Sequence, residues 1–481
     1  MSIPSPGAGG NFLEQLLGDL LGLMGKAAPG GSAHVELART LAHGVATGGE
    51  AEGNVDPADR IRLEEMARIA ELHIAELTGL RATTSGTPVE VLAVGPGSWA
   101  WHTVEDWGFL LDAAVSALPG TPASGRVSET ATDESAGPWS GGATAGPGPR
   151  SPAGTEGGLE GNSDDLLGGD LGDLGSLGDL GSLGDLGSAG IPDIFGPGDA
   201  MGVGGISQPP IPGGAPGGAD ILGRWMATMG PMLAAMQLGS AIGHLGRSAL
   251  GSYELPVPRQ DPSRIIVVPA NMKRFASDWS LPEDQVQLWV CLREITFHTV
   301  LARPHVATRV RDLLRAVAAD MAGDASSMIE SLGEIDPTDP DMLQRLLGDT
   351  ESLLNHEPSP EGLRATAELS AFTAVLLGYV NHILDQAGDR LLGGRRSLTE
   401  AWHRRQVERD PSDRAAEILL GLDLGPSQSE LGASFIDGVV ERSGEEQLAR
   451  LWATPGNIPT PAEVRAPGLW IERIDLEVDL G

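Results

Sequence analysis

The chain has 481 residues and a formal net charge of −34, because 66 acidic residues oppose 32 basic ones. A surface this negative repels nucleic acid and anionic lipid, so we expect neither as a direct partner. The single cysteine, Cys291, excludes an intramolecular disulfide, and no secretory signal pattern is visible, so the sequence predicts a cytoplasmic protein.

The N-terminal part of the chain, residues 1–118, is predicted to consist of a flexible segment followed by a mainly helical one. Residues 1–31 start with glycine and proline and hold a short amphipathic piece, so we expect a flexible N-terminal segment. Residues 32–118 form the N-terminal helical part of the folded domain, with a helix capped by Asp56 and a short strand in a segment that begins at Pro88. The expected inner face of the first helix consists of Ile61, Met66, Ile69, Ala70, His73, Ile74 and Leu77.

Residues 119–219 form a long insert dominated by glycine, proline, serine and aspartate. Such a composition buries too little apolar surface to offset the entropy of ordering, so we expect the insert to be disordered. The hexapeptide LGDLGS repeats at 171–176, 177–182 and 183–188. A calcium-binding roll needs a nine-residue period, so a linker is favoured, although the acidic, leucine-rich segments remain candidates for binding a protein partner.

Residues 220–481 are predicted to form the main helical domain. The stretch 221–250 has nearly the length of a membrane span, but Pro231, Gln237 and His244 interrupt it, so a buried helix pair is favoured over a span. Residues 263–269 are expected to form a buried strand. Further helices are expected near 306–322, 325–333, 340–354 and 361–387, a charge-rich helix after Leu398, and an extended tail from Pro459 to Trp470.

The segment from Ser280 to Arg303 is the predicted central helix. Ser280 with Glu283 three residues later matches a capping box, and Pro304 ends the run. Val286, Trp289, Val290, Phe297 and Val300 recur at helical spacing and predict one apolar stripe, in which Arg293 also lies.

This helix has the frame of a zinc-binding H-E-x-x-H motif, which needs two imidazoles one turn apart and a glutamate as general base. The corresponding residues are Arg293, Glu294 and Phe297, followed by His298. Arginine offers no lone pair and phenylalanine has no donor atom, so Glu294 remains as a vestigial general base without its metal ligands.

Four segments carry a family resemblance: 55–80, 250–298, 376–388 and the C-terminal run 432–473, with GASFIDGVVERSG, LWATPGNIPTPAEV and APGLWIERI. They resemble an actinobacterial family of zincin-like proteins usually labelled zinc-dependent metalloproteases or hydrolases. The resemblance implies a mainly α, zincin-like helical domain with a few short strands, interrupted here by the long insert.

The resemblance also implies a third, acidic zinc ligand just before a Gly-Tyr pair in a later helix. That pair is Gly378-Tyr379, and Leu377 precedes it. The three degenerate ligand positions would then be Arg293, Phe297 and Leu377, so we expect no bound metal and the ancestral zinc to be lost. A displaced site built from Glu294, His298 and His382 is the alternative, and it would need three convergent ligands.

Two hypotheses follow. The first is a pseudo-metallopeptidase, with zinc binding and catalysis lost and a binding or scaffold role. The second is a hydrolase or peptidase that keeps Glu294 as general base, with a displaced metal or none, assisted by His298 or His382.

Overall fold

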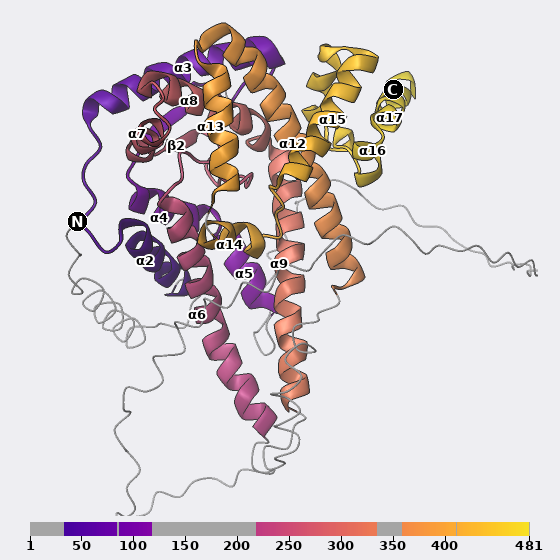
Figure 1. Cartoon of the computed structure of the whole chain (residues 1–481). Helices are drawn as coiled ribbons and strands as arrows, with labels where there is room; N and C mark the ends of the chain where they lie inside the picture. Colours follow the sequence, from indigo (N-terminus) through magenta and orange to yellow (C-terminus); the bar gives the residue numbers. More distant parts are fainter. Residues whose placement is uncertain (1–32, 84–85, 118–217, 334–357, 410, 481) are drawn as a thin grey trace, which may run out of the picture. The chain divides into compact units, whose positions relative to one another are not determined.

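A computed structural model of the chain describes residues 33–83, 86–117, 218–333, 358–409 and 411–480 (Figure 1). All of them belong to one compact unit, formed by Met1–Arg126 and Ala215–Gly481. The predicted N-terminal segment, residues 118–217 with nearly the whole predicted insert, and the predicted helix at 340–354 lie outside the described residues.

The described part of the chain is mainly α, as predicted. Its α-helices and 3₁₀ helices (η) are α2 (Ala33–Thr47), α3 (Pro57–Thr78), α4 (Pro96–Asp106), α5 (Gly108–Ala117), α6 (Gly218–Gly246), α7 (Pro269–Asp278), α8 (Glu283–Leu301), α9 (Pro304–Gly333), α12 (Pro360–Leu391), α13 (Arg395–Val407), α14 (Pro411–Leu419), α15 (Pro426–Ser443), η2 (Glu445–Trp452), η3 (Pro455–Asn457), α16 (Pro461–Arg465) and α17 (Pro467–Leu480).

Two short parallel strands, β1 (Glu90–Ala93) and β2 (Arg264–Val267), form the sheet within these residues. Val91 pairs with Ile265, and the successive residues Ile265 and Ile266, which point to opposite faces, are both buried, so β2 is covered on both faces. An antiparallel bridge from Gly251 to Val267 places the loop after α6 beside β2. The same loop contains Tyr253 and Glu254, which belong to the site described below.

The ends of α3 follow local sequence signals, but its buried face does not match the prediction. Asp56 accepts a hydrogen bond from the amide of Ala58 at 2.9 Å, and Gly79 ends the helix in the left-handed conformation. The buried residues are Asp59, Leu63, Ala67, Ala70, Ile74 and Thr78. Ile61 and Ile69 are 59% and 44% exposed, so the predicted inner face was wrong for these two. The small side chains at 67 and 70 are among the buried ones, and α8 is the helix that packs most extensively against α3.

Helix α12 lies at the centre of the packing and contacts α15, α9, α8 and α3 (Figure 1). Ser359 caps its first turn by accepting from the amide of Gly362 at 3.0 Å. Among the described residues, α12 alone is long and apolar enough to cross a membrane, and 67% of its most apolar window is buried in the structure. That burial is typical of a core helix.

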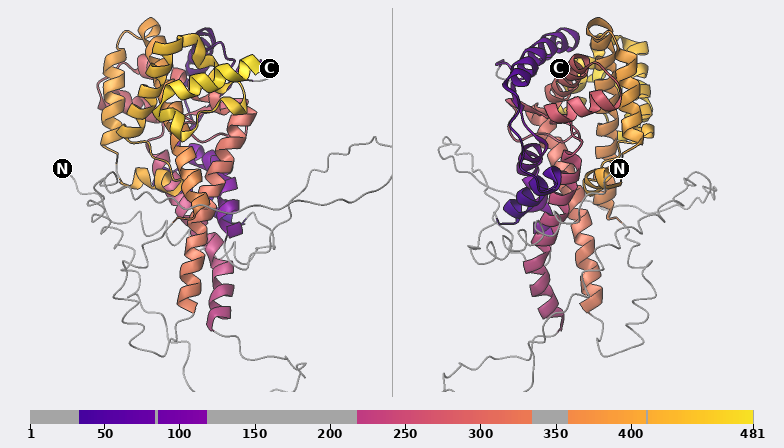
Figure 2. Two further views of the ribbon diagram at one scale, coloured as in Figure 1. Left: turned by 90° about the vertical axis from the view of Figure 1, so that its right-hand side faces the viewer. Right: turned by 60° about the vertical axis from the view of Figure 1, so that its left-hand side comes forward.

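The segment 221–250 folds as one helix, α6, with Pro231 inside it, where a helix pair was predicted. Figure 2 shows α6 alongside α2, its main neighbour. A Cβ at Gly239 would overlap the Ala38 carbonyl oxygen, so glycine permits the two backbones to approach.

The C-terminal run is helical, so the predicted extended tail was wrong. Thr460 and Glu463 form a capping box for the short α16, and α17 follows directly. The buried indole of Trp470 donates to the Asn457 carbonyl oxygen at 2.7 Å. Pro461 and Pro467, which suggested an extended segment, begin these two helices, since proline fits the first helical turn.

Candidate functional site

The motif helix α8 is buried along most of its length. From Val286 to Leu301 every residue except Leu288 is buried, because α3, α7, α9, α12 and β2 all pack against it. The predicted single apolar stripe therefore understated its burial. The predicted capping box was also wrong: Pro282 occupies the N-cap position without a side-chain cap, and Ser280 adopts a positive φ of 53°.

Arg293, at the first ligand position, is buried and held in three ways. Its Nη1 donates to Glu294 Oε1 at 2.8 Å, so the neighbouring carboxyl group pairs with this guanidinium. The guanidinium also lies 4.7 Å from the ring centres of both Phe297 and Trp402. Phe297, the second ligand position, thus serves as a stacking surface for the arginine one turn before it.

Glu294 is completely buried, and each of its carboxylate oxygens accepts a hydrogen bond. Oε2 accepts from the Tyr253 amide at 2.8 Å, while Oε1 accepts from Arg293. A Cβ at Gly251 would overlap the carboxyl group, so that position closes tightly over it. Burial raises the pKa of Glu294 to about 7, and the attraction of Arg293 opposes this only in part.

His298 is fully buried and uses both ring nitrogens. Nδ1 lies 2.8 Å from the Tyr253 hydroxyl, and Nε2 lies 3.1 Å from the Pro262 carbonyl oxygen. A carbonyl only accepts, so Nε2 carries the hydrogen and Nδ1 accepts from tyrosine. Burial lowers the pKa of His298 to about 4, which keeps the imidazole neutral.

A second buried ion pair, which the sequence analysis missed, adjoins this centre. Arg405 Nη2 donates to Glu254 Oε1 at 2.8 Å and to the Ser248 carbonyl oxygen at 2.6 Å, and its guanidinium lies 4.8 Å from the Trp402 ring centre. Burial alone would raise the pKa of Glu254, but Arg405 and Arg293 outweigh it and hold that pKa below its usual value. A lone glutamate among apolar residues in SYELPVP was the available signal.

Leu377 and His382 lie on α12. Leu377, the third predicted ligand position, is partly buried and packs against the core. His382 Nε2 lies 2.9 Å from Gln386 Nε2 and lines a pocket with the end of α3 and η2. Within the described ranges, no three histidine, cysteine, aspartate or glutamate side chains are placed to hold a metal ion, so Glu294, His298 and His382 do not form a metal-ligating group there.

The donor set at the motif does not fit a zinc ion. A guanidinium and a phenyl ring occupy the positions where imidazoles would ligate, and the adjacent Glu294 carboxyl group is paired with the guanidinium. The arrangement is that of a stacked, charge-paired core.

The chain was compared with curated proteins, solved structures and protein-family models. A search of curated proteins found no match. A solved structure from Chloroflexus aurantiacus, described as "a putative hydrolase with a novel fold", matches with a TM-score of 0.52 and 18% identity, over 92% of this chain and 98% of that one. The family model described as zincin-like metallopeptidase matches residues 34–174 and 198–471. The chain therefore belongs to the zincin-like metallopeptidase family.

Proposed function

We propose that this chain is a zincin-like metallopeptidase-family protein that has lost zinc binding and catalysis and acts by binding a protein partner. The observation that carries the proposal is the state of the motif glutamate. Glu294 is fully enclosed, its oxygens accept from Arg293 and the Tyr253 amide, and the ligand positions beside it hold Arg293 and Phe297.

A working metallopeptidase needs a glutamate that can reach a metal-bound water and a substrate. Reaching Glu294 would require opening the packing of Arg293 against Trp402 and leaving a buried guanidinium without its carboxylate. Breaking a buried ion pair costs about 3–5 kcal/mol, so such an opened state would be rare.

One observation favours the second candidate, a hydrolase that uses Glu294 as base. A general base works best with a pKa near the working pH, and burial raises the pKa of Glu294 to about 7. His298 or His382 would assist. Against this candidate, both nitrogens of His298 are already hydrogen-bonded and His382 lines a separate pocket.

Metal content and peptidase activity separate the two candidates. The full-length protein is purified without chelator, offered Zn²⁺, freed of excess metal and analysed by plasma mass spectrometry, and its activity on casein and a peptide library is measured. We expect metal well below one ion per chain and no hydrolysis above background. The variants are Glu294→Gln and, as a control on the same helix, the exposed Asp284→Asn.

Stoichiometric zinc that disappears in His298→Gln or His382→Gln would contradict the proposal. Hydrolysis lost in Glu294→Gln but kept in Asp284→Asn would establish the hydrolase instead, with or without metal.

A further inference from the structure

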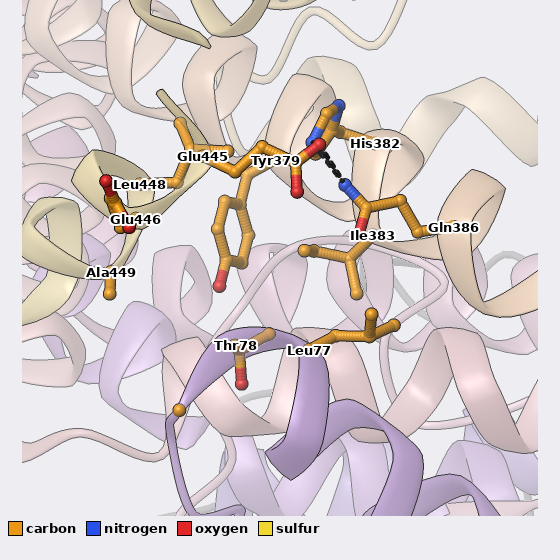
Figure 3. A pocket seen from close by; sticks show the side chains of 11 residues that line it. Leu77, Thr78, Tyr379, His382, Ile383, Gln386, Glu445, Glu446, Leu448 and Ala449 are labelled. Carbon is orange, nitrogen blue, oxygen red and sulfur yellow. Dashed lines mark hydrogen bonds and ion pairs between the residues drawn. The ribbon is translucent and has the colours of Figure 1, made fainter. Parts of the chain in front are cut away.

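A pocket of about 360 Å³ lies apart from the motif centre, between the end of α3, one face of α12 and η2 (Figure 3). This volume falls in the range of roughly 300–1,000 Å³ that is usual for small-molecule sites. Its lining residues are Leu77, Thr78, Gly79, Tyr379, His382, Ile383, Gln386, Glu445, Glu446, Leu448 and Ala449.

The pocket contains a buried hydroxyl without a partner. Tyr379 is 1% exposed, and its hydroxyl oxygen has no hydrogen-bond partner in the structure. Figure 3 shows the ring extending from α12 toward the end of α3, with the hydroxyl directed toward Thr78. Leaving a buried hydroxyl unpaired costs about 1–3 kcal/mol, so the position suits a group that receives a hydrogen bond from a ligand or donates one to it.

Tyr379 is fixed in place by its neighbours. Its ring packs edge-on against the buried Trp452, with the ring centres 5.5 Å apart. Burial raises the pKa of Tyr379 above its ordinary value, which keeps the hydroxyl neutral, while the nearby Arg303 guanidinium opposes this rise. The hydroxyl is therefore a preorganised neutral group in the pocket wall.

The charges of the wall favour a cation. Glu445 and Glu446 line the pocket, and none of its lining residues is lysine or arginine. The 22-residue α3 also ends here, and the C-terminal end of a helix carries partial negative charge. Gln386 donates to Glu445 at 2.9 Å, which orients this carboxylate within the pocket. The Arg303 guanidinium, which acts on the Tyr379 hydroxyl, is not among the lining residues.

The remaining wall is aliphatic. Leu77, Ile383, Leu448 and Ala449 offer apolar surface of the kind that covers an alkyl chain. A ligand that suits this wall has a positive nitrogen with N–H donors and a short aliphatic stem.

We propose that this pocket binds an alkylammonium group, supplied by a free aliphatic diamine or by the side chain of a lysine residue. The Tyr379 hydroxyl and the Glu445 and Glu446 carboxylates accept from the ammonium, and the aliphatic wall covers its stem. The site is independent of the motif centre and of the loss of catalysis.

Isothermal titration calorimetry on the full-length protein tests this site. The probes are cadaverine and N-acetyl-lysine methylamide, with pentanediol as the neutral control and glutarate as the anionic control. We expect saturable binding of at least one ammonium probe at millimolar concentration or below, weakened by salt. The probe that binds more tightly identifies the source as a free diamine or a lysine side chain. No saturable binding of either ammonium probe, equal binding of pentanediol, or tighter binding of glutarate would overturn the proposal.

Variants place the binding in this pocket. Tyr379→Phe removes only the hydroxyl, and we expect it to lower the affinity for the ammonium probe about three- to tenfold. Glu445→Gln should weaken it about two- to fivefold, since this carboxylate is partly solvated. Glu472→Gln, on the exposed face of α17, is the matched control and should leave affinity unchanged.

Stability supplies an independent readout. Because Tyr379→Phe removes an unpaired buried hydroxyl, we expect its Tm to equal or exceed that of the parent chain while its affinity falls. Unchanged affinity in this folded variant would remove the pocket from the explanation.

Discussion

Arg293 and Phe297 stand where an H-E-x-x-H motif has its two imidazoles, and Arg293 gives the motif helix a positive charge that cannot act as a metal ion does. A metal ion would accept electron pairs from the side chains around it. The Arg293 guanidinium instead donates to Glu294 and stacks between two aromatic rings. At the scale of single residues, the contacts of Glu294 are therefore those of a packed, hydrogen-bonded core group.

The first prediction concerns the removal of this guanidinium. Arg293→Met keeps an aliphatic side chain of similar length but leaves Glu294 buried without its cation. At alkaline pH, where Glu294 would have to be ionised, we expect a loss of about 3–5 kcal/mol in the free energy of unfolding, measured by urea denaturation, and a smaller loss at neutral pH, where Glu294 takes up a proton. Arg390→Met is the control, because this exposed arginine has, among the described residues, an ion pair only with Glu76, at 3.7 Å. Its substitution should lower the free energy of unfolding by at most about 1 kcal/mol.

The double variant Arg293→Met/Glu294→Gln should recover part of the lost stability, because the uncompensated charge is gone. If the single and double variants are equally unstable, packing rather than charge explains the effect.

The second prediction concerns the pH dependence that Glu294 contributes. Its pKa rises from 4.5 to about 7 on folding, so the folded chain binds more protons than the unfolded chain between these values. Stability from this group is therefore full below about pH 4.5 and falls as the pH rises to about 7, by on the order of 3 kcal/mol. We measure the free energy of unfolding of the parent chain and of Glu294→Gln by urea denaturation across this pH window. The parent value minus the variant value should show that fall. A difference that is constant with pH would contradict it.

The third prediction has the opposite sign. The pKa of His298 falls from 6.5 to about 4 on folding, so its contribution to stability is full above about pH 6.5 and is lost as the pH falls through 4. The free energy of unfolding of the parent chain minus that of His298→Gln should therefore grow with pH. Over the same range, the corresponding difference for Glu294→Gln declines. The two groups nearly cancel in the parent chain, and only the separate variants reveal them.

At the scale of elements, the Gly378-Tyr379 pair has a packing role that its place in the family pattern does not express. A Cβ at Gly432 on α15 would overlap the Ala374 carbonyl oxygen of α12, and a Cβ at Gly378 would overlap the backbone of Gly432. Each glycine lets the other helix approach at backbone distance.

The fourth prediction follows from this contact. Gly432→Ala should push α12 and α15 apart and lower the free energy of unfolding by about 1–3 kcal/mol, read by urea denaturation. Gly468→Ala is the matched control in helix α17, where no atom lies within 4 Å of the added Cβ. That control should be neutral or raise stability by up to about 1 kcal/mol. Equal effects of the two substitutions would mean that the helices have room to separate.

The comparison of sequence with structure also belongs to the elements. The two strands, α12 and the cap of α3 were predictable, because Asp56, Pro57 and runs of apolar residues are local signals, whereas the pairing of the strands was not predicted. The cap at Ser280 failed because the N-cap fell at Pro282. The packing of the half-buried Trp402 and Arg405 in a charge-rich helix depends on Arg293 and Glu254, more than a hundred residues away, and no local pattern encodes such partners.

At the scale of the whole molecule, the family match divides around residues 175–197. This gap holds most of the three LGDLGS repeats. The helices that flank the insert, α5 and α6, contact each other directly, so the fold does not depend on the repeats to bring them together. The contribution of the repeats can therefore be tested separately from the packing of the helical unit.

The fifth prediction uses that division. Deleting residues 175–197 should leave Tm within about 2 °C of the parent value, because shortening a long connection changes its closure entropy only slightly. If the acidic, leucine-rich segment binds the partner, crosslinking and mass spectrometry in the source cell should recover that partner with the full chain and not with the deletion. A chain with the same 23 residues in a different order controls for composition and length. A large fall in Tm would place the repeats within the fold, and a partner retained by the deletion would place its binding surface on the helical unit.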